Sequence, residues 1–301
     1  MNLKTLTYER TGRIARLTLD RPQRGNGITM DMPVELAAMV ERANLDPEVH
    51  VIALAGNGSG FCGGYDLVAS AEGKMDDGSR PDRPAGSPLD PLVQLENHLP
   101  DRTWDPTIDY AMMSRNVRGF MSLWHSEKPV VCKVHGFCVA GGTDMALCSD
   151  LLVIADDAKI GYPPARVWGI PTTMHWVHRI GLERAKRLLF TGDCLTGKQA
   201  HEWGLAIDSA PASELDARFE ALLERIARMP KNQLVMMKML LNQTVKDIGS
   251  TQTLAVLLDG VARHTKEGYA FQARAMEVGF KAAVRERDEP FGDFGLDAFR
   301  R

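Results

Sequence analysis

The stretch "HGFCVAGGTDMALCSDLLVIADDAKIGYPPARVWGIPTT", residues 135–173, decides the fold. An apolar run leads into Gly141 and Gly142, a short helical segment carries the acid Asp144, and a second apolar run ends at two prolines. Short apolar runs bounded by glycine or proline are typical of buried strands. A strand, a glycine turn, a helix and another strand in this order predict an α/β core with crossover connections.

The same alternation precedes this stretch. Apolar patterns predict strands over residues 14–19 and 49–56, and between them an amphipathic helix over 29–46 for which Thr29 is the expected N-cap. A further strand signal covers residues 128–142, and from residue 213 onward the pattern is mainly helical. We therefore expect an α/β core over residues 1–210 and a helical region over residues 211–301.

Residues 69–110 have a different composition. The segment "SAEGKMDDGSRPDRPAGSPLDP" is rich in Pro, Gly, Asp and Ser and shows neither a helix nor a strand period. This composition predicts a long loop insertion over about residues 70–105. Loops of that length in compact domains are functional lids or passive insertions, and both interpretations stay open here.

Charge and cysteine content exclude several classes of protein. The net charge is −3, and no block of Lys and Arg occurs, which argues against a nucleic-acid partner. The first 22 residues contain neither a signal peptide nor a spanning segment, so we expect a cytoplasmic protein without membrane contact. Five cysteines without a CxxC pair, and without clustered histidines, predict reduced core residues and no metal site.

Two glycine-rich turns each follow a predicted strand: Phe61–Leu67 and Ala140–Asp144. Glycine lets a backbone N–H group approach a ligand without a side chain in the way. Two such groups that converge on one point would form an oxyanion hole. Neither turn fits a phosphate loop or a dinucleotide fingerprint, and each could also be a tight turn and nothing more.

With their flanks, these turns resemble a known family. The segments "LDRPQRGNGITMDM", "GSGFCGGYDL", "KPVVCKVHGFCVAGGTDMALCSDLLVIADDAKIG" and "GLERAKRLLFTGDCLTGKQAHEWGLA" follow one another as in the crotonase superfamily, in its enoyl-CoA hydratase/isomerase family. The resemblance implies an α/β spiral of ββα repeats, with C-terminal helices that assemble homotrimers, often paired into hexamers. It also implies an acyl-CoA substrate, so that coenzyme A arrives with the substrate and no separate cofactor is expected.

The resemblance also implies roles for particular residues. The backbone N–H groups of Tyr65 and Gly141 would hold the thioester oxygen as it gains enolate charge. The familiar hydratases place two glutamates around one water, and this chain has Asp144 at the first position and Pro164 at the second. Asp144 would remain as the acid/base, one methylene shorter than glutamate, although an acid at a helix start can also serve the helix alone. Pro164 cannot titrate.

Residues that could contact coenzyme A lie along the first turn and among the arginines, whose charge would complement phosphate groups. The candidates are Arg24, Gly63, Gly64, Asp66, Leu67, Arg285 and Arg287. Asp66 could instead only tie its own loop.

Three functions remain open at this point. The first is an enoyl-CoA hydratase-like enzyme that uses Asp144. The second is another enolate reaction of the same scaffold: double-bond isomerisation, thioester hydrolysis, dehalogenation or carbon–carbon cleavage. The third is an acyl-CoA-binding protein without turnover, because one scaffold hosts many chemistries.

Overall fold

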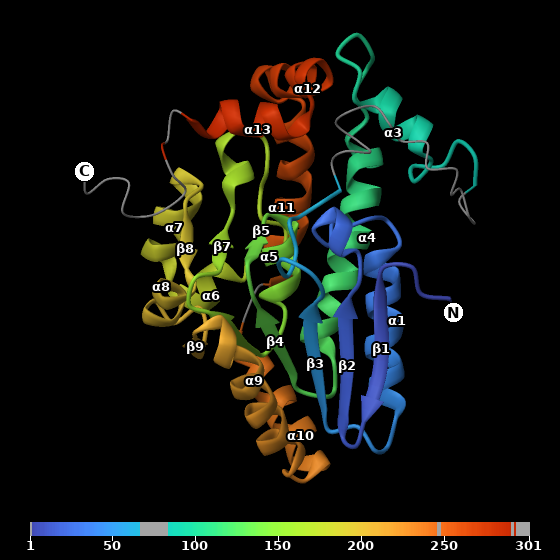
Figure 1. Cartoon of the computed structure of the whole chain (residues 1–301). Coiled ribbons are helices and arrows are strands. Elements are labelled where there is room, and N and C mark those ends of the chain that lie inside the picture. Colours follow the sequence, from blue (N-terminus) through green and yellow to red (C-terminus); the bar gives the residue numbers. More distant parts are fainter. Residues whose placement is uncertain (1, 67–83, 246–247, 290–291, 293–301) are drawn as a thin grey trace.

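Two β-sheets form the centre of the molecule (Figure 1), a computed structural model that describes residues 2–66, 84–245, 248–289 and 292. The larger sheet has six strands in the order β1-β2-β3-β4-β6-β9, of which only β1 and β2 are antiparallel neighbours. The smaller sheet has the order β5-β7-β8. The strands of the larger sheet are β1 (Leu6–Thr11), β2 (Ile14–Leu19), β3 (Val51–Gly56), β4 (Val130–Val134), β6 (Leu151–Ala155) and β9 (Asp208–Ala210).

The chain passes between the sheets in a repeated pattern. Strand β4 of the larger sheet leads to β5 (Phe137–Val139) of the smaller one and then to helix α5 (Gly141–Ala146), and β6 leads in the same way to β7 (Lys159–Gly161). Gly136 makes the corner between β4 and β5 at φ +60°, and a Cβ there would lie 1.9 Å from the Ser59 carbonyl oxygen. The predicted α/β core of ββα repeats is confirmed.

Helices α1 (Met32–Leu45) and α4 (Pro106–His125) pack together beside strands β1 to β3 (Figure 1). The expected N-cap of α1 was wrong: the helix begins after Asp31, whose side chain makes no capping bond, and the buried Thr29 hydroxyl has no partner among the described residues. Pro33 lies in the first turn and fixes φ at a helical value, so that the start of the helix needs no side-chain cap.

The predicted insertion over residues 70–105 is not a continuous loop. Within the described residues it contains helix α3 (Pro91–Asn97), and α4 starts at Pro106. In both cases an aspartate caps a helix that begins with proline. Asp90 accepts a hydrogen bond from the Leu92 N–H at 3.0 Å, and Asp105 accepts one from the Thr107 N–H at 2.8 Å. Residues 67–83, the other part of the predicted loop, lie outside the described residues.

Helices make up most of the chain from residue 212 to 288, and the predicted boundary at 210 falls between β9 and α9. These helices are α9 (Ala212–Ala227), α10 (Lys231–Gln243), α11 (Ile248–Arg263), α12 (Lys266–Val278) and α13 (Phe280–Asp288). They are not a separate body, because α9 packs on the larger sheet and α11 packs on α4. Helices α6 (Trp176–Ile180), α7 (Leu182–Thr191) and α8 (Gly197–Glu202) and strand β8 (Cys194–Thr196) complete the core.

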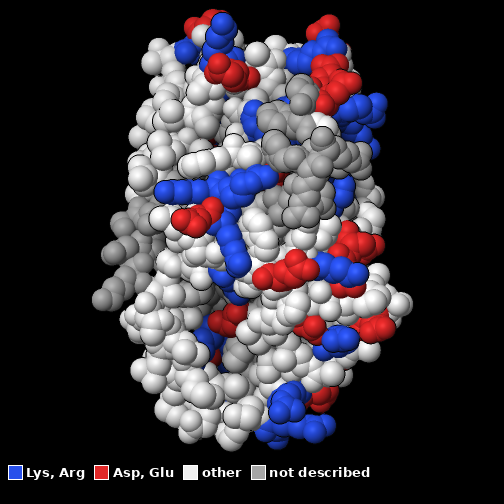
Figure 2. Space-filling model, turned by 90° about the vertical axis from the view of Figure 1, so that its left-hand side faces the viewer, with Lys and Arg blue, Asp and Glu red and all other residues white. Residues whose placement is uncertain are grey.

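All five cysteines are buried, as predicted, and none of them forms a disulfide bond. On the face where α7 and α8 lie, positive and negative side chains are interspersed (Figure 2). Across residues 2–66, 84–245 and 248–289, no helix is both long and apolar enough to cross a membrane.

Candidate functional site

The two glycine turns meet because their strands pair in parallel. The Phe61 N–H donates to the Phe137 carbonyl at 2.9 Å, and the Val139 N–H donates to the Cys62 carbonyl at 3.0 Å. Cys62 and Cys138 form a parallel bridge. Since neighbouring parallel strands end at the same edge, both turns leave the sheet side by side.

The turns approach so closely that side chains would not fit between them. A Cβ on Gly64, where φ is +97°, would lie 2.6 Å from the Ala140 Cβ and 3.5 Å from the Gly141 nitrogen. A Cβ on Gly142 would lie 2.6 Å from the Cys62 carbonyl oxygen. Glycine at these positions is therefore a packing requirement, and it brings the Gly141 nitrogen next to the turn that carries Tyr65.

Two backbone N–H groups remain available at this contact. Ile28 pairs with the turn through its N–H to the Gly64 carbonyl and its carbonyl to the Asp66 N–H, which leaves the Tyr65 N–H between them unused. Gly141 is the first residue of α5, where an N–H has no partner within the helix. No described residue accepts a hydrogen bond from either group. Two adjacent free donors suit an oxygen that carries negative charge.

Asp144 is 1% exposed and lies in α5, three residues after Gly141. Its Oδ1 atom accepts the N–H groups of Thr172 at 2.8 Å and Thr173 at 3.1 Å, and the Thr173 hydroxyl at 3.2 Å. Its Oδ2 atom is buried and has no partner among the described residues. One carboxylate oxygen is thus fixed and the other is free to bind a ligand or a water.

Burial raises the pKa of Asp144 from 3.8 to about 7, against the lowering effect of the Thr173 and Thr172 N–H groups. The negative charge of Asp259 raises this pKa further. An aspartate with such a pKa can both take and give a proton near neutral pH, as a general acid/base requires. The helix N-terminus alone would lower the pKa of an acid by stabilising its charged form, so the raised pKa of Asp144 comes from its burial.

Pro164 lies in the 3₁₀-helix η2 (Pro163–Arg166). Its carbonyl oxygen accepts N–H groups from Val167, Trp168 and Gly169 at 2.8 to 3.0 Å. The residue therefore shapes the chain between β7 and Thr172, and its side chain has no group that can transfer a proton.

A second carboxylate near Asp144 comes from α11, and the sequence patterns did not identify it. Asp259 accepts the Arg263 guanidinium at 2.6 Å and the Ile170 N–H at 3.3 Å. It is 6% exposed, and its charge raises the pKa values of Asp144 and Tyr65. One pattern in the sequence could have identified Asp259: it lies four residues before Arg263 in a largely apolar helix, a spacing at which the two side chains can pair. Its pairing with Arg263 leaves Asp259 unsuited to the role of a free base.

Two tyrosines complete the surroundings of Asp144. Burial raises the pKa of both Tyr65 and Tyr162 well above 10, and the charge of Asp144 acts in the same direction, so both phenols keep their protons. Tyr162 donates to the Ile170 carbonyl at 2.9 Å. The Tyr65 hydroxyl is buried, and no described residue forms a hydrogen bond with it.

The candidate coenzyme A contacts on the first turn are held by ion pairs. Arg24 and Arg21 donate to opposite oxygens of Asp66 at 2.9 and 2.8 Å. Partial burial opposes ionisation, but hydrogen bonds from the two arginines hold the pKa of Asp66 below its usual value. Asp66 therefore stabilises its loop through these ion pairs. The Arg24 side chain is 39% exposed, so part of it remains accessible to a ligand. Gly63 and Gly64 lie in the turn itself, and Leu67 lies outside the described residues.

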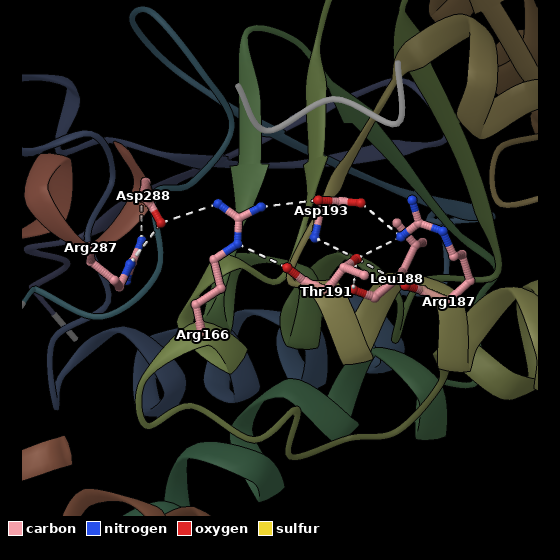
Figure 3. Close-up of polar contacts among 7 residues, drawn as sticks. All are labelled: Arg166, Arg187, Leu188, Thr191, Asp193, Arg287 and Asp288. Atoms are coloured by element: carbon pink, nitrogen blue, oxygen red, sulfur yellow. Dashed lines mark hydrogen bonds and ion pairs between the residues drawn. The ribbon is translucent and has the colours of Figure 1, made fainter. Parts of the chain in front are cut away.

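The two candidate arginines of the tail differ from each other. Arg287 binds both oxygens of Asp288, which also accepts the buried Arg166 guanidinium at 3.2 Å (Figure 3). Arg166 continues this network to Asp193 at 3.0 Å. Asp288 thus fastens α13 to η2 while Arg287 pairs with it from the same helix, whereas Arg285 is exposed. No contact within the described part of the chain joins either arginine to Asp144, so their role toward coenzyme A stays a prediction.

Comparisons with known proteins agree with this architecture. The family model for enoyl-CoA hydratase/isomerase matches residues 9–93 and 104–268. The crystal structure of an enoyl-CoA hydratase from Mycobacterium smegmatis is 55% identical, with a TM-score of 0.90 over 98% of this chain and 96% of that one.

Two relatives known by sequence are more distant. EchA13 of Mycobacterium tuberculosis is 30% identical over 249 residues, which cover 81% of this chain and 74% of that protein. The 1,2-epoxyphenylacetyl-CoA isomerase of Escherichia coli is 28% identical over 254 residues, which cover 82% of this chain and 83% of that protein. On the family match and the crotonase-like fold, the chain belongs to the enoyl-CoA hydratase/isomerase family.

Proposed function

We propose that this protein is an enoyl-CoA hydratase-like enzyme that acts on an acyl-CoA thioester through an enolate. The observation that carries the proposal is the position of Asp144. Its free Oδ2 atom lies one short helix segment from the unpartnered N–H of Gly141, which adjoins that of Tyr65. A charge-stabilising pair of donors and a titratable carboxyl thus share one site.

The two N–H groups act on the thioester oxygen. As the α-carbon and the oxygen share the negative charge of an enolate, the hydrogen bonds from Tyr65 and Gly141 strengthen. Loss of one such donor typically costs roughly 3 to 4 kcal/mol of transition-state stabilisation. Because both donors belong to the backbone, the turn geometry rather than a side chain sets their position.

Asp144 moves the proton. In its ionised form it takes a proton from water while the water oxygen bonds to the β-carbon of a 2-enoyl thioester, and the carbon–carbon double bond becomes the enolate. The protonated Asp144 then gives this proton to the α-carbon, so that the elements of one water are added. One carboxyl with a pKa of about 7 can perform both transfers in turn, which offsets the absence of an acid at Pro164.

Double-bond isomerisation is the second candidate. The free Oδ2 of Asp144 is the specific observation in its favour, because a 3-enoyl thioester needs one base to remove an α-proton and return it to the γ-carbon.

Mass spectrometry distinguishes these reactions. Purified protein is incubated with 2-enoyl-CoA and 3-enoyl-CoA of several chain lengths in oxygen-18 water, beside the variant Asp144→Asn. Hydratase activity adds one labelled hydroxyl, isomerase activity changes the double bond without label, and thioester hydrolysis releases free coenzyme A. Binding of acyl-CoA without any product, or turnover unchanged in Asp144→Asn, would contradict the proposed function.

We also propose that the chain assembles as a homotrimer or hexamer in the cytoplasm. In the isolated chain, α10 exposes a set of large apolar side chains that solvent would not favour: Met236, Met237, Met239, Leu240 and Leu241. Their contact with a second copy is supported by the family and is tested by light scattering of the purified protein. A monomer at micromolar concentration would contradict it.

A further inference from the structure

We propose that the Tyr65 hydroxyl holds the attacking water opposite Asp144. Tyr65 would then serve the reaction twice, through its backbone N–H at the thioester oxygen and through its side chain at the water. This inference rests on the proposed function and names the group that completes the site where Pro164 replaces an acid.

The position of the Tyr65 ring supports this role. A Cβ added to Gly141 would lie 2.7 Å from the Tyr65 Cε2 atom and 3.0 Å from Cδ2, so the ring lies directly against the second donor of the proposed oxyanion hole. The ring therefore packs against Gly141, the first residue of α5, and the charge of Asp144 in the same helix raises the pKa of the Tyr65 phenol. Any alanine at position 141 would displace the ring first.

Three polar atoms of Tyr65, Asp144 and Thr172 lack a hydrogen-bond partner. The Tyr65 hydroxyl, the Asp144 Oδ2 atom and the Thr172 hydroxyl are all buried without a partner in the described residues, although the Thr172 side chain lies close enough to Asp144 to lower the pKa of that carboxyl. Thr172 is joined to Asp144 through its N–H at 2.8 Å. The Asn116 amide lies close enough to Tyr65 to lower the pKa of the phenol, but it does not satisfy the hydroxyl. Buried polar groups normally have partners, and one water could bridge several of these atoms.

The protonation states fit a water site. Burial and the negative charge of Asp144 keep the proton on the Tyr65 phenol, so this group can hold a water but cannot remove a proton from it. Asp144 takes the proton from the water as the oxygen bonds to the β-carbon, and it returns this proton to the α-carbon. Tyr65 stays neutral throughout, and no further reactant is required.

Tyr162 does not compete for this role. Its hydroxyl is already engaged with the Ile170 carbonyl at 2.9 Å, which fixes the segment between Pro164 and Thr172. Asp259 is likewise engaged, through Arg263. Tyr65 has both a hydroxyl without a partner among the described residues and a ring that lies against Gly141.

The variant Tyr65→Phe tests the proposal, because it keeps the backbone N–H and most of the ring. Two reactions are followed: hydration of 2-enoyl-CoA, and exchange of the α-protons of a saturated acyl-CoA with deuterium oxide. Exchange needs the two N–H groups and Asp144 but no attacking water. Loss of one hydrogen bond to the reacting water predicts a fall in kcat for hydration of about tenfold or more, with KM and the exchange rate near those of the wild type.

Tyr8→Phe is the matched control. The Tyr8 hydroxyl on β1 is also buried and has no partner in the described part of the chain, and its ring lies 4.4 Å from the Arg42 guanidinium, at the edge of the larger sheet. This variant is expected to hydrate at the wild-type rate.

Hydration at the wild-type rate in Tyr65→Phe would overturn the inference, and so would an equal loss of hydration and exchange, which would indicate a disturbed oxyanion hole. A wild-type protein that hydrates no substrate would overturn the proposed function first, and the inference with it.

Discussion

Replacement of Asp144 by Asn should stabilise the protein while it abolishes turnover. Asn keeps an oxygen for the N–H groups of Thr172 and Thr173, and it places an uncharged amide where Oδ2 now lies unpartnered. The folded protein then no longer has to bury a carboxylate that has lost its proton. A residue that function requires can cost stability, as a buried carboxylate does, and its replacement can then stabilise the protein.

The size and pH dependence follow from the pKa of Asp144, which burial raises from 3.8 to about 7. Between about pH 4 and pH 7 the unfolded chain loses this proton while the folded protein keeps it. The folded state then binds more protons, so the free energy of unfolding of the wild type falls as pH rises in this window. This decrease in the free energy of unfolding is complete above about pH 7 and amounts to about 4 kcal/mol at most.

Thermal unfolding of the two proteins by circular dichroism, at a series of pH values from 4 to 8.5, measures this effect. The Tm of Asp144→Asn should exceed that of the wild type by an amount that grows up to about pH 7 and then stays constant. In a chain of this size 1 kcal/mol corresponds to about 2 to 4 °C. Equal Tm values at pH 8, or a difference that does not change with pH, would refute the assigned environment of Asp144.

Three further predictions concern the same site and its support. The value of kcat/KM for hydration should rise with pH through about 7, because the reaction needs ionised Asp144 in the free enzyme. Gly64→Ala should lower kcat/KM by about 100-fold or more, since its Cβ would meet Ala140 at 2.6 Å and separate the two N–H groups. Asp193→Asn should lower the free energy of unfolding by about 1.5 to 3 kcal/mol, because the buried Arg166 charge loses one carboxylate partner and keeps Asp288.

Each of these has a control. The pH dependence of kcat/KM is compared with the pH dependence of acyl-CoA binding, and the affinity for acyl-CoA should not rise with pH in the same way. Gly12→Ala, where a Cβ meets no atom within 4 Å but φ is +58°, separates the cost of backbone strain from the clash at Gly64. Asp208→Asn removes a carboxylate whose pair with Arg218 is exposed, and it should change stability by less than about 1 kcal/mol. Equal effects in a variant and its control would contradict the corresponding prediction.

Local sequence patterns were sufficient for the core. The apolar runs and glycine turns around residues 61–67 and 135–161 predicted strands in an α/β core with crossover connections, because these follow from hydrophobic period and backbone freedom. The convergence of the two turns was implied only by the resemblance to the family. The helix starts at Asp90 and Asp105 were overlooked, although the Asp–Pro pairs marked them. There the loop-like composition of the preceding residues obscured a local signal.

The surroundings of Asp144 could not be predicted in the same way. Asp259 reaches the site from α11, more than a hundred residues along the chain, through the packing of that helix on α4. The raised pKa of Asp144 depends first on burial, which no spacing of residues specifies. The position of the Tyr65 ring could not be predicted either, because the family resemblance gives this residue only a backbone role and says nothing of its side chain.

The central claim is that one carboxyl, Asp144, moves a proton at the α-carbon of an acyl-CoA held by two backbone N–H groups. Its most direct test is the exchange of α-protons of a saturated acyl-CoA in deuterium oxide, followed by mass spectrometry for the wild type and Asp144→Asn. We predict deuterium incorporation by the wild type, with a rate that rises through about pH 7, and none by the variant. Exchange at equal rates in both proteins, or no exchange by a wild type that binds the thioester, would contradict the claim.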